Sequence, residues 1–278
     1  MQIHILTDNR VSQRGLLAEH GLSLFIQHQG RNVLMDTGQS DVYLRNAAVM
    51  GLSLTTADAI LLSHGHYDHG GGLPLFPHAN HVTPVHVQAT ALLPKYALNA
   101  DRQTRRDIGF PWNPDDLDPA SLLLQIEDGP RTFLPGMHLL TNMPYVHPFE
   151  HHPVGFIVKT DAGIAPDLMK DEQILVVETR KGLAVFLGCA HPGVINCLTA
   201  VQKAFPGHPI ALLMGGMHLG NAGTQRINES IRRMQDLDIQ TVVPLHCTGI
   251  TAICAMERRL GAHCKVLCAG DSLEIAEA

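Results

Sequence analysis

Four side chains that can bind metal ions stand within the six residues from His64 to His69. They are His64, His66, Asp68 and His69. Because side chains alternate along a strand, the imidazoles of His64 and His66 point to the same side and can hold one cation. Asp68 and His69 lie on the following turn, where they suit a second ion beside the first. The run therefore predicts a centre for two divalent metal ions.

The elements around this run agree with such a centre. A short apolar strand, residues 59–62, precedes it, and three glycines, residues 70–72, follow it. Glycines let the backbone turn sharply because they have no Cβ atom to clash. A chance cluster among the 18 histidines of the chain is the alternative. It would require strand, ligand spacing and glycine turn to coincide without a function.

The run matches the His-x-His-x-Asp-His motif of the metallo-β-lactamase superfamily, and Asp36-Thr37-Gly38 resembles the earlier aspartate motif of that superfamily. Three later segments resemble a narrower, dihydropterin synthase-like subgroup, which is labelled after an archaeal pterin-pathway enzyme. These segments are Leu187–Gly193, Gly215–Leu219 and Pro244–Gly249. The resemblance implies an α/β fold, an αββα sandwich of two packed mixed β-sheets with outer helices. It leaves the substrate open, because the superfamily includes hydrolases of many kinds and oxygen reductases.

The resemblance also implies further ligands at later strand ends. His246, after the apolar strand 242–245, matches the final ligand position, and His191 is the candidate for the other ion. Since strand ends from both halves meet along one edge of such a sandwich, we expect His246 to converge with the first motif. His218 is an alternative ligand, for which we favour a hydrogen bond to substrate or to a developing oxyanion.

Cys189 departs from the superfamily pattern, because many members place a metal-bridging aspartate at this position. A thiolate binds both zinc and iron, so we expect Cys189 to face the metal site through its own sulfur or through His191. A small buried cysteine without a ligand role is the alternative. Without a bridging carboxylate, the second ion is held more weakly or at a different spacing.

A metal-dependent hydrolase is the function that this site predicts. The expected cofactors are two divalent ions, zinc first, with iron or manganese as alternatives. Metal coordination lowers the pKa of water to about 7, and Asp68 can orient that water and pass its proton onward. The expected substrate is an ester, lactone or (cyclic) phosphodiester of a small molecule, phosphate-bearing or pterin-related, with condensation as an alternative reaction. A di-iron redox protein and a ligand-binding protein with a degenerate metal site are the other candidates.

Composition and residue patterns indicate which partners and which cellular location to expect. A net charge of −6 without a long run of Lys and Arg argues against a nucleic-acid partner. No apolar run reaches the roughly 18 residues of a membrane span, and residues 1–8 do not resemble a signal peptide, so we expect a cytoplasmic protein. The six cysteines show no Cys-x-x-Cys pair, which predicts reduced thiols. The oligomeric state stays open, a homodimer included.

The chain is predicted to form a single metallo-β-lactamase-like domain, residues 1–278, with two similar halves and the second beginning near Val154. Between the halves, residues 89–153 hold nine prolines and the only tryptophan, Trp112. We interpret this segment as an irregular insertion that covers the active-site mouth, with a surface excursion as the alternative. The side chains that it offers to substrate are Tyr96, Arg102, Arg105, Arg106, Phe110, Trp112, Tyr145 and Phe149.

Other histidines are assigned by position alone. Those of the insertion that can approach the metal site are His138, His147, His151 and His152. The histidines elsewhere in the chain, His20 among them, are interpreted as structural or solvated.

Overall fold

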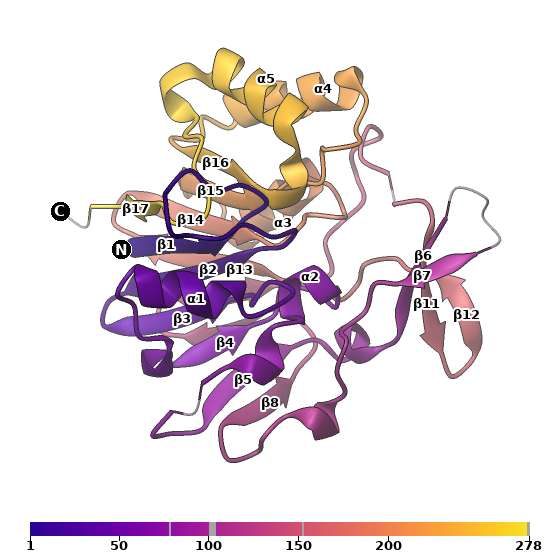
Figure 1. Ribbon diagram of the computed structural model, residues 1–278. Helices are drawn as coiled ribbons and strands as arrows, with labels where there is room; N and C mark the ends of the chain where they lie inside the picture. Colours follow the sequence, from indigo (N-terminus) through magenta and orange to yellow (C-terminus); the bar gives the residue numbers. More distant parts are fainter. Residues whose placement is uncertain (78, 100–103, 152, 277–278) are drawn as a thin grey trace. The chain divides into compact units, whose positions relative to one another are not determined.

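The computed structural model describes residues 1–77, 79–99, 104–151 and 153–276, which form two compact units (Figure 1). Unit 1 comprises residues 1–128, 153–171 and 268–276, and unit 2 comprises residues 129–152 and 172–267. Arg102 and His152, which the sequence proposed as substrate or site contacts, lie outside the described residues.

A seven-stranded mixed sheet forms the body of unit 1. Its strands, in spatial order, are β17 (Ser272–Glu274), β1 (Gln2–Thr7), β2 (Ser23–His28), β3 (Arg31–Met35), β4 (Ala59–Leu61), β5 (Thr83–Val87) and β8 (Leu122–Ile126). The strands from β17 to β3 pair antiparallel, whereas those from β3 to β8 pair parallel. Since β3 and β4 are parallel neighbours, the residues that follow them emerge at the same edge of the sheet.

Helix α1 (Val42–Val49) packs on this sheet, with Tyr43 and Ala47 buried in a cluster that includes Phe25 and Leu34. The short helix α2 (Tyr67–Gly70) follows β4 after five residues and carries half of the metal-binding run. The unit also contains the 3₁₀ turns η1 (Leu54–Thr56), η2 (Leu73–Leu75), η3 (Ala89–Leu92) and η4 (Pro114–Asp116).

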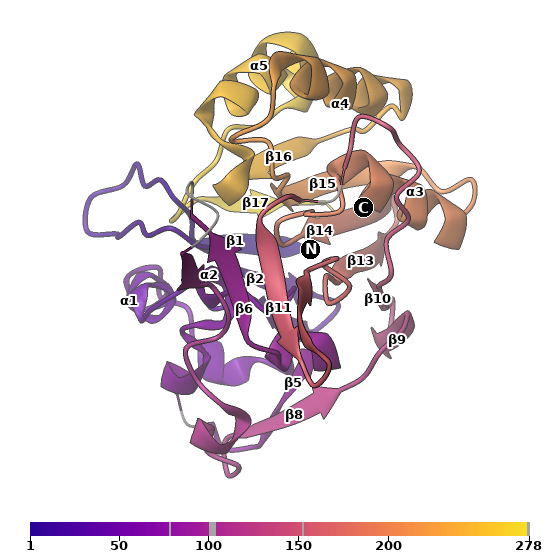
Figure 2. The ribbon, with the colours of Figure 1, turned by 90° about the vertical axis from the view of Figure 1, so that its right-hand side faces the viewer.

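A second sheet of unit 1 has four antiparallel strands in the order β12 (Gly163–Pro166), β11 (Phe156–Thr160), β6 (Lys95–Leu98) and β7 (Arg105–Asp107). Figure 2 shows β6 and β11 side by side, although about 60 residues separate them in the chain. Arg105 on β7 lies over the ring of Tyr96 on β6, 4.2 Å from its centre. This cation–π contact engages an arginine that the sequence assigned to substrate.

Unit 2 has a six-stranded mixed sheet in the order β16 (Val242–Leu245), β15 (Ile210–Gly216), β14 (Gly182–Leu187), β13 (Ile174–Thr179), β10 (Met137–Leu140) and β9 (Arg131–Leu134). The strands β14, β15 and β16 are parallel, and the others pair antiparallel.

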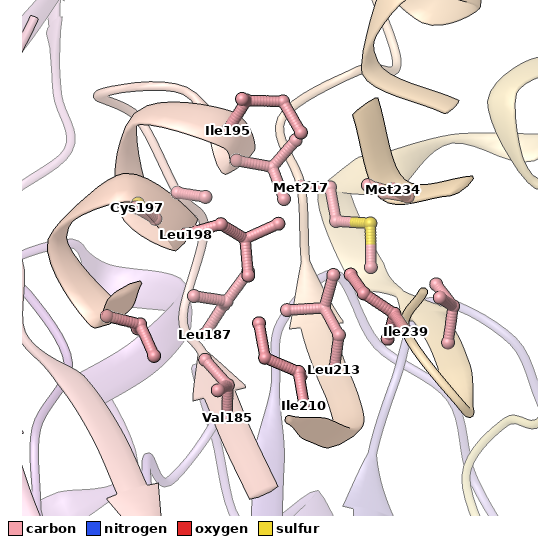
Figure 3. Packing of buried hydrophobic residues seen from close by; sticks show 14 of the residues in the cluster. Val185, Leu187, Ile195, Cys197, Leu198, Ile210, Leu213, Met217, Met234 and Ile239 are labelled. Carbon is pink, nitrogen blue, oxygen red and sulfur yellow. The ribbon is translucent and has the colours of Figure 1, made fainter. Parts of the chain in front are cut away.

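Three amphipathic helices of unit 2, α3 (Val194–Ala204), α4 (Thr224–Asp236) and α5 (Ile250–Leu260), contribute apolar side chains to one buried cluster with this sheet (Figure 3). Val185 and Leu187 of β14 and Leu213 of β15 alternate along their strands and meet Leu198 of α3. The turns η5 (His246–Thr248) and η6 (Gly261–His263) flank α5. Burying one such leucine contributes about 1.5–3 kcal/mol, so the sheet edge that bears the β14–β16 turns is firmly held.

The segment 89–153 is more regular than its proline content suggested. It contains the strands β6 to β10, because every one of its prolines lies in a connection or in a 3₁₀ turn and none interrupts a ladder. The segment is also divided between the units at residue 128, and residues 153–171 return to unit 1. A second half beginning near Val154 is therefore wrong: β11 pairs with β6, β12 pairs with β11, and the closing strand β17 pairs with β1.

Among the helices of the described chain, none combines the length and the apolar composition needed to cross a membrane.

Candidate metal-binding site

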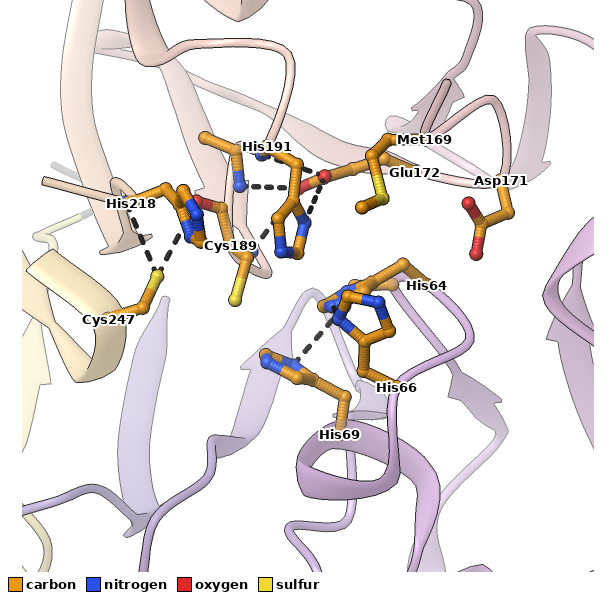
Figure 4. A network of polar contacts seen from close by, with 12 residues as sticks. His64, His66, His69, Met169, Asp171, Glu172, Cys189, His191, His218 and Cys247 are labelled. Carbon is orange, nitrogen blue, oxygen red and sulfur yellow. Dashed lines mark hydrogen bonds and ion pairs between the residues drawn. The ribbon is translucent and has the colours of Figure 1, made fainter. Parts of the chain in front are cut away.

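The metal-binding run of unit 1 places its imidazoles together. His64 and His66 are buried, and the Nε2 atom of His64 lies 3.0 Å from the Nδ1 atom of His66. The ring of His69 lies 4.2 Å from that of His64, centre to centre. Figure 4 shows the three rings gathered where the loop after β4 enters α2. The predicted clustering of these three histidines is therefore present within unit 1.

Asp36 anchors this group of rings. Its carboxylate accepts hydrogen bonds from the Ser63 backbone N–H at 2.7 Å and from the Ser63 hydroxyl at 2.7 Å, and it contacts Nδ1 of His69 at 2.6 Å. All three residues are fully buried. A carboxylate on Nδ1 fixes both the orientation and the tautomer of the ring, which is typical of zinc-binding histidines. Asp36 holds this position with a φ of 60°, a left-handed conformation that costs free energy in a non-glycine residue.

A second buried network holds the backbone between the first two histidines. The N–H of Gly65 donates to Oδ2 of Asp171 at 2.8 Å, while Oδ1 of the same carboxylate lies 3.3 Å from Nζ of Lys95. Lys95 also pairs with Asp167 at 2.5 Å and is 2% exposed. Burial lowers the pKa of Lys95, but Asp171 and Asp167 outweigh it and raise the pKa above its ordinary value. A Cβ atom at Gly65 would lie 2.2 Å from the Ala91 carbonyl oxygen, so the loop requires glycine here.

Asp68 lies on the first turn of α2 and is 6% exposed. Its Oδ2 atom is 3.1 Å from Nε2 of His20, whose side chain is 55% exposed. The sequence interpretation of His20 as merely structural or solvated is therefore incomplete. His20 links the carboxylate of the motif to solvent, a contact that sequence spacing could not reveal.

Aromatic side chains of the insertion cover the end of α2. Trp112 donates from Nε1 to the Gly70 carbonyl oxygen at 2.7 Å and stacks on Phe110, with ring centres 4.7 Å apart. A pocket of about 620 Å³ lies beside them within unit 1. Its wall includes Gln39, Tyr67, Lys95 and Asp107 together with Phe110 and Trp112. This volume lies within the range of small-molecule sites, roughly 300–1,000 Å³.

In unit 2, donor side chains follow three neighbouring parallel strands. Cys189, His218 and Cys247 each stand two residues beyond the end of their strand, after β14, β15 and β16 respectively. One donor atom from each of these three residues lies within 4.8 Å of the others. The backbone N–H of His218 donates to Sγ of Cys247 at 3.3 Å, and this Sγ donates to the Cys189 carbonyl oxygen at 3.5 Å (Figure 4).

Glu172 anchors His191 in the way that Asp36 anchors His69. The buried carboxylate of Glu172 contacts Nδ1 of His191 at 3.0 Å and accepts the backbone N–H groups of Cys189, Ala190 and His191. Burial raises the pKa of Glu172, but the His191 ring and the backbone N–H groups of His191 and Ala190 lower it below its ordinary value. The His191 ring also lies 4.5 Å from that of His218. The predicted Cys189, His191 and His218 thus belong to one cluster of unit 2.

Cys247 is the member of this cluster that sequence reasoning missed. Burial raises the pKa of its thiol, but contacts with Cys189 and His218 and the charge of His246 lower the net pKa well below the ordinary value. Its neighbour His246 is buried and has a φ of 48°. The signal that could have revealed Cys247 is the shared offset of two residues from three strand ends.

Two histidines that the sequence left free to approach the metal site have other contacts. His138 lies 2.6 Å from Glu178 and 2.9 Å from Thr132, and Nε2 of His147 lies 3.0 Å from the Thr199 hydroxyl. These contacts tie both rings to β9, β13 and α3 within unit 2.

The donors of both units fit divalent metal ions. Imidazole and carboxylate ligands suit zinc, iron and manganese, and thiolates favour zinc or iron. Carboxylates that orient histidines through Nδ1 are present in each unit. Both donor groups also follow the carboxyl ends of parallel strands, where binding sites of α/β proteins concentrate.

Comparison with known proteins points to one family. The family model described as "Metallo-beta-lactamase superfamily" matches residues 17–246. A solved structure described as Tm1679, a metal-dependent hydrolase of the beta-lactamase superfamily, is 33% identical, with a TM-score of 0.86 and 99% of each chain covered. A diphosphatase from the PhnP family, 15% identical with a TM-score of 0.56, covers 99% of this chain and 98% of its own and shows a likeness of fold alone.

A curated relative from Methanocaldococcus jannaschii is 27% identical over 259 residues, which cover 84% of this chain and 83% of the relative. It is named 7,8-dihydropterin-6-methyl-4-(beta-D-ribofuranosyl)-aminobenzene-5'-phosphate synthase. Together these matches confirm the predicted metallo-β-lactamase-like fold and the resemblance on which it was based.

Proposed function

We propose that this chain, which belongs to the metallo-β-lactamase superfamily, is a metal-dependent hydrolase of a small-molecule ester, lactone or (cyclic) phosphodiester. The observation that carries the proposal is the buried motif of unit 1, in which Asp36 orients His69 beside His64 and His66. Buried imidazoles are costly unless they are paired or hold an ion, so their assembly around an anchoring carboxylate favours a metal site.

The proposed ligands are the residues that the sequence analysis singled out: His64, His66, Asp68, His69, Cys189, His191 and His246. Zinc is the expected metal, with iron or manganese as alternatives, and two ions are proposed. When bound, such ions supply a water of lowered pKa and polarise a carbonyl or phosphoryl oxygen.

Three side chains have proposed roles in moving or placing protons. Asp68 orients the attacking water and accepts its proton. His20 receives that proton from Asp68 and passes it to solvent, because it contacts the carboxylate at 3.1 Å and is itself half exposed. His218 donates a hydrogen bond to the oxygen on which negative charge develops.

The substrate is proposed to bind in the pocket beside α2. Tyr67, the residue between His66 and Asp68 in the motif, lines this pocket together with Phe110 and Trp112. Such walls accept a flat ring, which is consistent with a pterin-related or phosphate-bearing compound like the product that names the archaeal relative. That relative is called a synthase, so condensation in place of hydrolysis is the competing reaction.

The test begins with metal analysis of protein purified without added metal. Generic ester, lactone, phosphodiester and cyclic phosphodiester substrates are then assayed with the wild type and with His66→Ala. We expect zinc in the wild type and hydrolysis that His66→Ala abolishes. Hydrolysis that survives in His66→Ala, or that no metal restores to stripped protein, would contradict the proposal. A coloured iron protein that lacks hydrolytic activity would favour the redox alternative.

A further inference from the structure

We propose that Cys189, His218 and Cys247 form a sulfur-rich site that binds one thiophilic divalent cation. The proposal concerns unit 2 alone and does not depend on hydrolytic activity. It groups the sulfur of Cys189, named above among the hydrolase ligands, with Cys247, and the ring nitrogen of His218 that does not bind the ion can still donate the hydrogen bond proposed above. It adds Cys247, which the sequence analysis did not name as a ligand, and it assigns the sulfur of Cys189 to a defined set of partners.

The first argument is the register of three parallel strands. Leu187 of β14 pairs with Gly215 of β15, and Gly216 of β15 pairs with Leu245 of β16, so the three strands end nearly level. Each proposed ligand follows its strand end by the same two residues. Equal offsets from level strand ends bring the three side chains to one place, although 58 residues separate Cys189 from Cys247.

The second argument is that each of the three turns after β14, β15 and β16 contains a strained backbone conformation. Ala190, His218 and His246 have φ values of 55°, 47° and 48°, in the left-handed region that non-glycine residues rarely adopt. Such residues cost about 1–3 kcal/mol each and persist where the surroundings impose them, commonly at binding sites. Here one strained residue occurs in each of the three turns that carry the ligands.

The third argument is the close approach that Gly216 allows. A Cβ atom at Gly216 would lie 2.7 Å from Sγ of Cys247, 2.4 Å from the Gly188 carbonyl oxygen and 3.2 Å from Cα of Cys189. The β15 turn must therefore be free of a side chain for Cys189 and Cys247 to meet across it.

The donor geometry suits one tetrahedral ion. Around zinc, with bonds of about 2.0–2.3 Å, neighbouring donor atoms lie about 3.3–3.8 Å apart. The three donors are within 4.8 Å of one another, so rotamer adjustments of about 1 Å complete the set. Two thiolates and one imidazole leave a fourth position for water or for another side chain.

Charge and burial select the class of ion. Cys189 is 3% exposed and His218 and Cys247 are partly buried, so the site has little water to stabilise charge. Two thiolates neutralise a divalent cation, and sulfur ligands favour zinc, iron or cobalt over magnesium and calcium. Protons still carried by the thiols are released to solvent as the metal–sulfur bonds form.

The direct test uses wild-type protein kept reduced. X-ray absorption at the zinc edge of zinc-loaded protein should include sulfur neighbours at about 2.3 Å in addition to nitrogen and oxygen at about 2.0–2.1 Å. Titration of metal-free protein with Co²⁺ should produce a near-ultraviolet thiolate-to-cobalt band. A zinc edge with nitrogen and oxygen neighbours alone, or cobalt binding without that band, would overturn the proposal.

Variants then assign the sulfur atoms. Cys247→Ser and Cys189→Ser should each remove about half of the cobalt–thiolate band, and the double variant should remove all of it. Cys254→Ser on the exposed side of α5 and the partly buried Cys264→Ser are matched controls that should keep the full band. Loss of the band in the controls, or its persistence in the double variant, would contradict the assignment. Circular dichroism identifies any variant that fails to fold. If a variant fails to fold, the sulfur neighbours at the zinc edge of the wild type decide whether the sulfur site exists.

One further variant separates this site from the hydrolase proposal. His66→Ala removes an imidazole of unit 1 and should leave the cobalt–thiolate band in place. A hydrolase that lacks the band refutes the sulfur site and the ligand role of Cys189 but leaves the hydrolase function standing, whereas a band without any hydrolysis refutes the proposed function alone.

Discussion

The two units present metal-binding side chains in different ways. In unit 1, six consecutive residues that lead from a loop into α2 supply four donors, and buried partners just after β3 and within residues 167–171 hold them in place. In unit 2, single donors come from three strand ends and gather only because the strands are parallel and end level. The first arrangement follows from the spacing of residues in a short stretch of sequence, whereas the second exists only after the sheet has formed. Variants that act differently on the two arrangements can test this contrast.

The largest expected effect concerns the motif itself. Asp68→Asn should lower turnover by about 10²–10⁴-fold, because the carboxylate that orients water and accepts its proton is lost. His218→Gln in unit 2 should cost less, about 10²–10³-fold, as expected for a hydrogen-bond donor to a developing charge. Steady-state kinetics with metal content measured in parallel checks both values. A larger loss of turnover in His218→Gln than in Asp68→Asn would contradict the proposal that Asp68 contributes more to turnover than His218.

The contrast between the units also explains what the sequence could predict. The motif from His64 to His69 is one short stretch of sequence, and its local spacing alone indicated the buried cluster that the structure contains. Cys247 belongs to a cluster that depends on the register of β14, β15 and β16, which no local pattern encodes. Lys95 was missed for a similar reason, because a lone lysine in a strand gives no sign of its two carboxylate partners.

The same reasoning applies to the fold. The apolar strand 242–245 was predicted over the residues that form β16, since its run of apolar residues is local. The division of residues 89–153 between two units was missed, because strand pairing between distant segments is decided by tertiary contacts. The convergence of His246 with the motif of unit 1 and the lid role of the insertion stay predictions.

The next prediction concerns the buried charges that support the metal-binding loop of unit 1. Lys95→Met leaves Asp167 and Asp171 buried without their cation, which should lower the free energy of unfolding by about 3–5 kcal/mol. Lys170→Met, which removes an exposed lysine from the same segment, is the control and should change little. Urea unfolding at neutral pH measures both changes. Equal stability of the two variants would show that the network does not support the loop.

The raised pKa of Lys95 adds a signature at alkaline pH. Because the folded state binds the proton more tightly, this stabilisation is complete below the ordinary pKa of 10.5 and is lost as pH rises through the folded value. Wild-type stability should therefore fall above about pH 10.5 by more than that of Lys95→Met. Parallel profiles of the two proteins would contradict this linkage.

A third comparison sets the two carboxylate anchors against each other. Asp36→Asn and Glu172→Gln each remove the charge that orients a histidine, and each should weaken zinc binding by about 10–100-fold. Competition with a fluorescent zinc chelator measures these affinities. If only Asp36→Asn weakens binding, the cluster of unit 2 does not contribute a ligand through His191.

Glu172 also has a distinct pH dependence. Its pKa is lowered on folding, so its contribution to stability is present above the ordinary value of 4.5 and is lost as pH falls through the folded value. Glu172→Gln should therefore flatten the acid limb of the stability profile. At neutral pH it should cost about 1–3 kcal/mol, because backbone N–H groups of residues 189–191 lose a charged acceptor. An unchanged acid limb, measured by urea unfolding from pH 3 to 7, would rule out this role.

The smallest expected effect concerns the insertion of unit 1. Trp112→Phe keeps a ring stacked on Phe110 but removes the hydrogen bond to the Gly70 carbonyl oxygen, which is worth about 0.5–1.5 kcal/mol. If this wall of the pocket binds substrate, KM should rise about 2- to 10-fold while zinc content stays the same. Since Gly70 directly follows His69, the alternative is that Trp112 supports the metal-binding loop. Loss of zinc affinity with an unchanged KM would favour that structural role and would contradict the predicted lid.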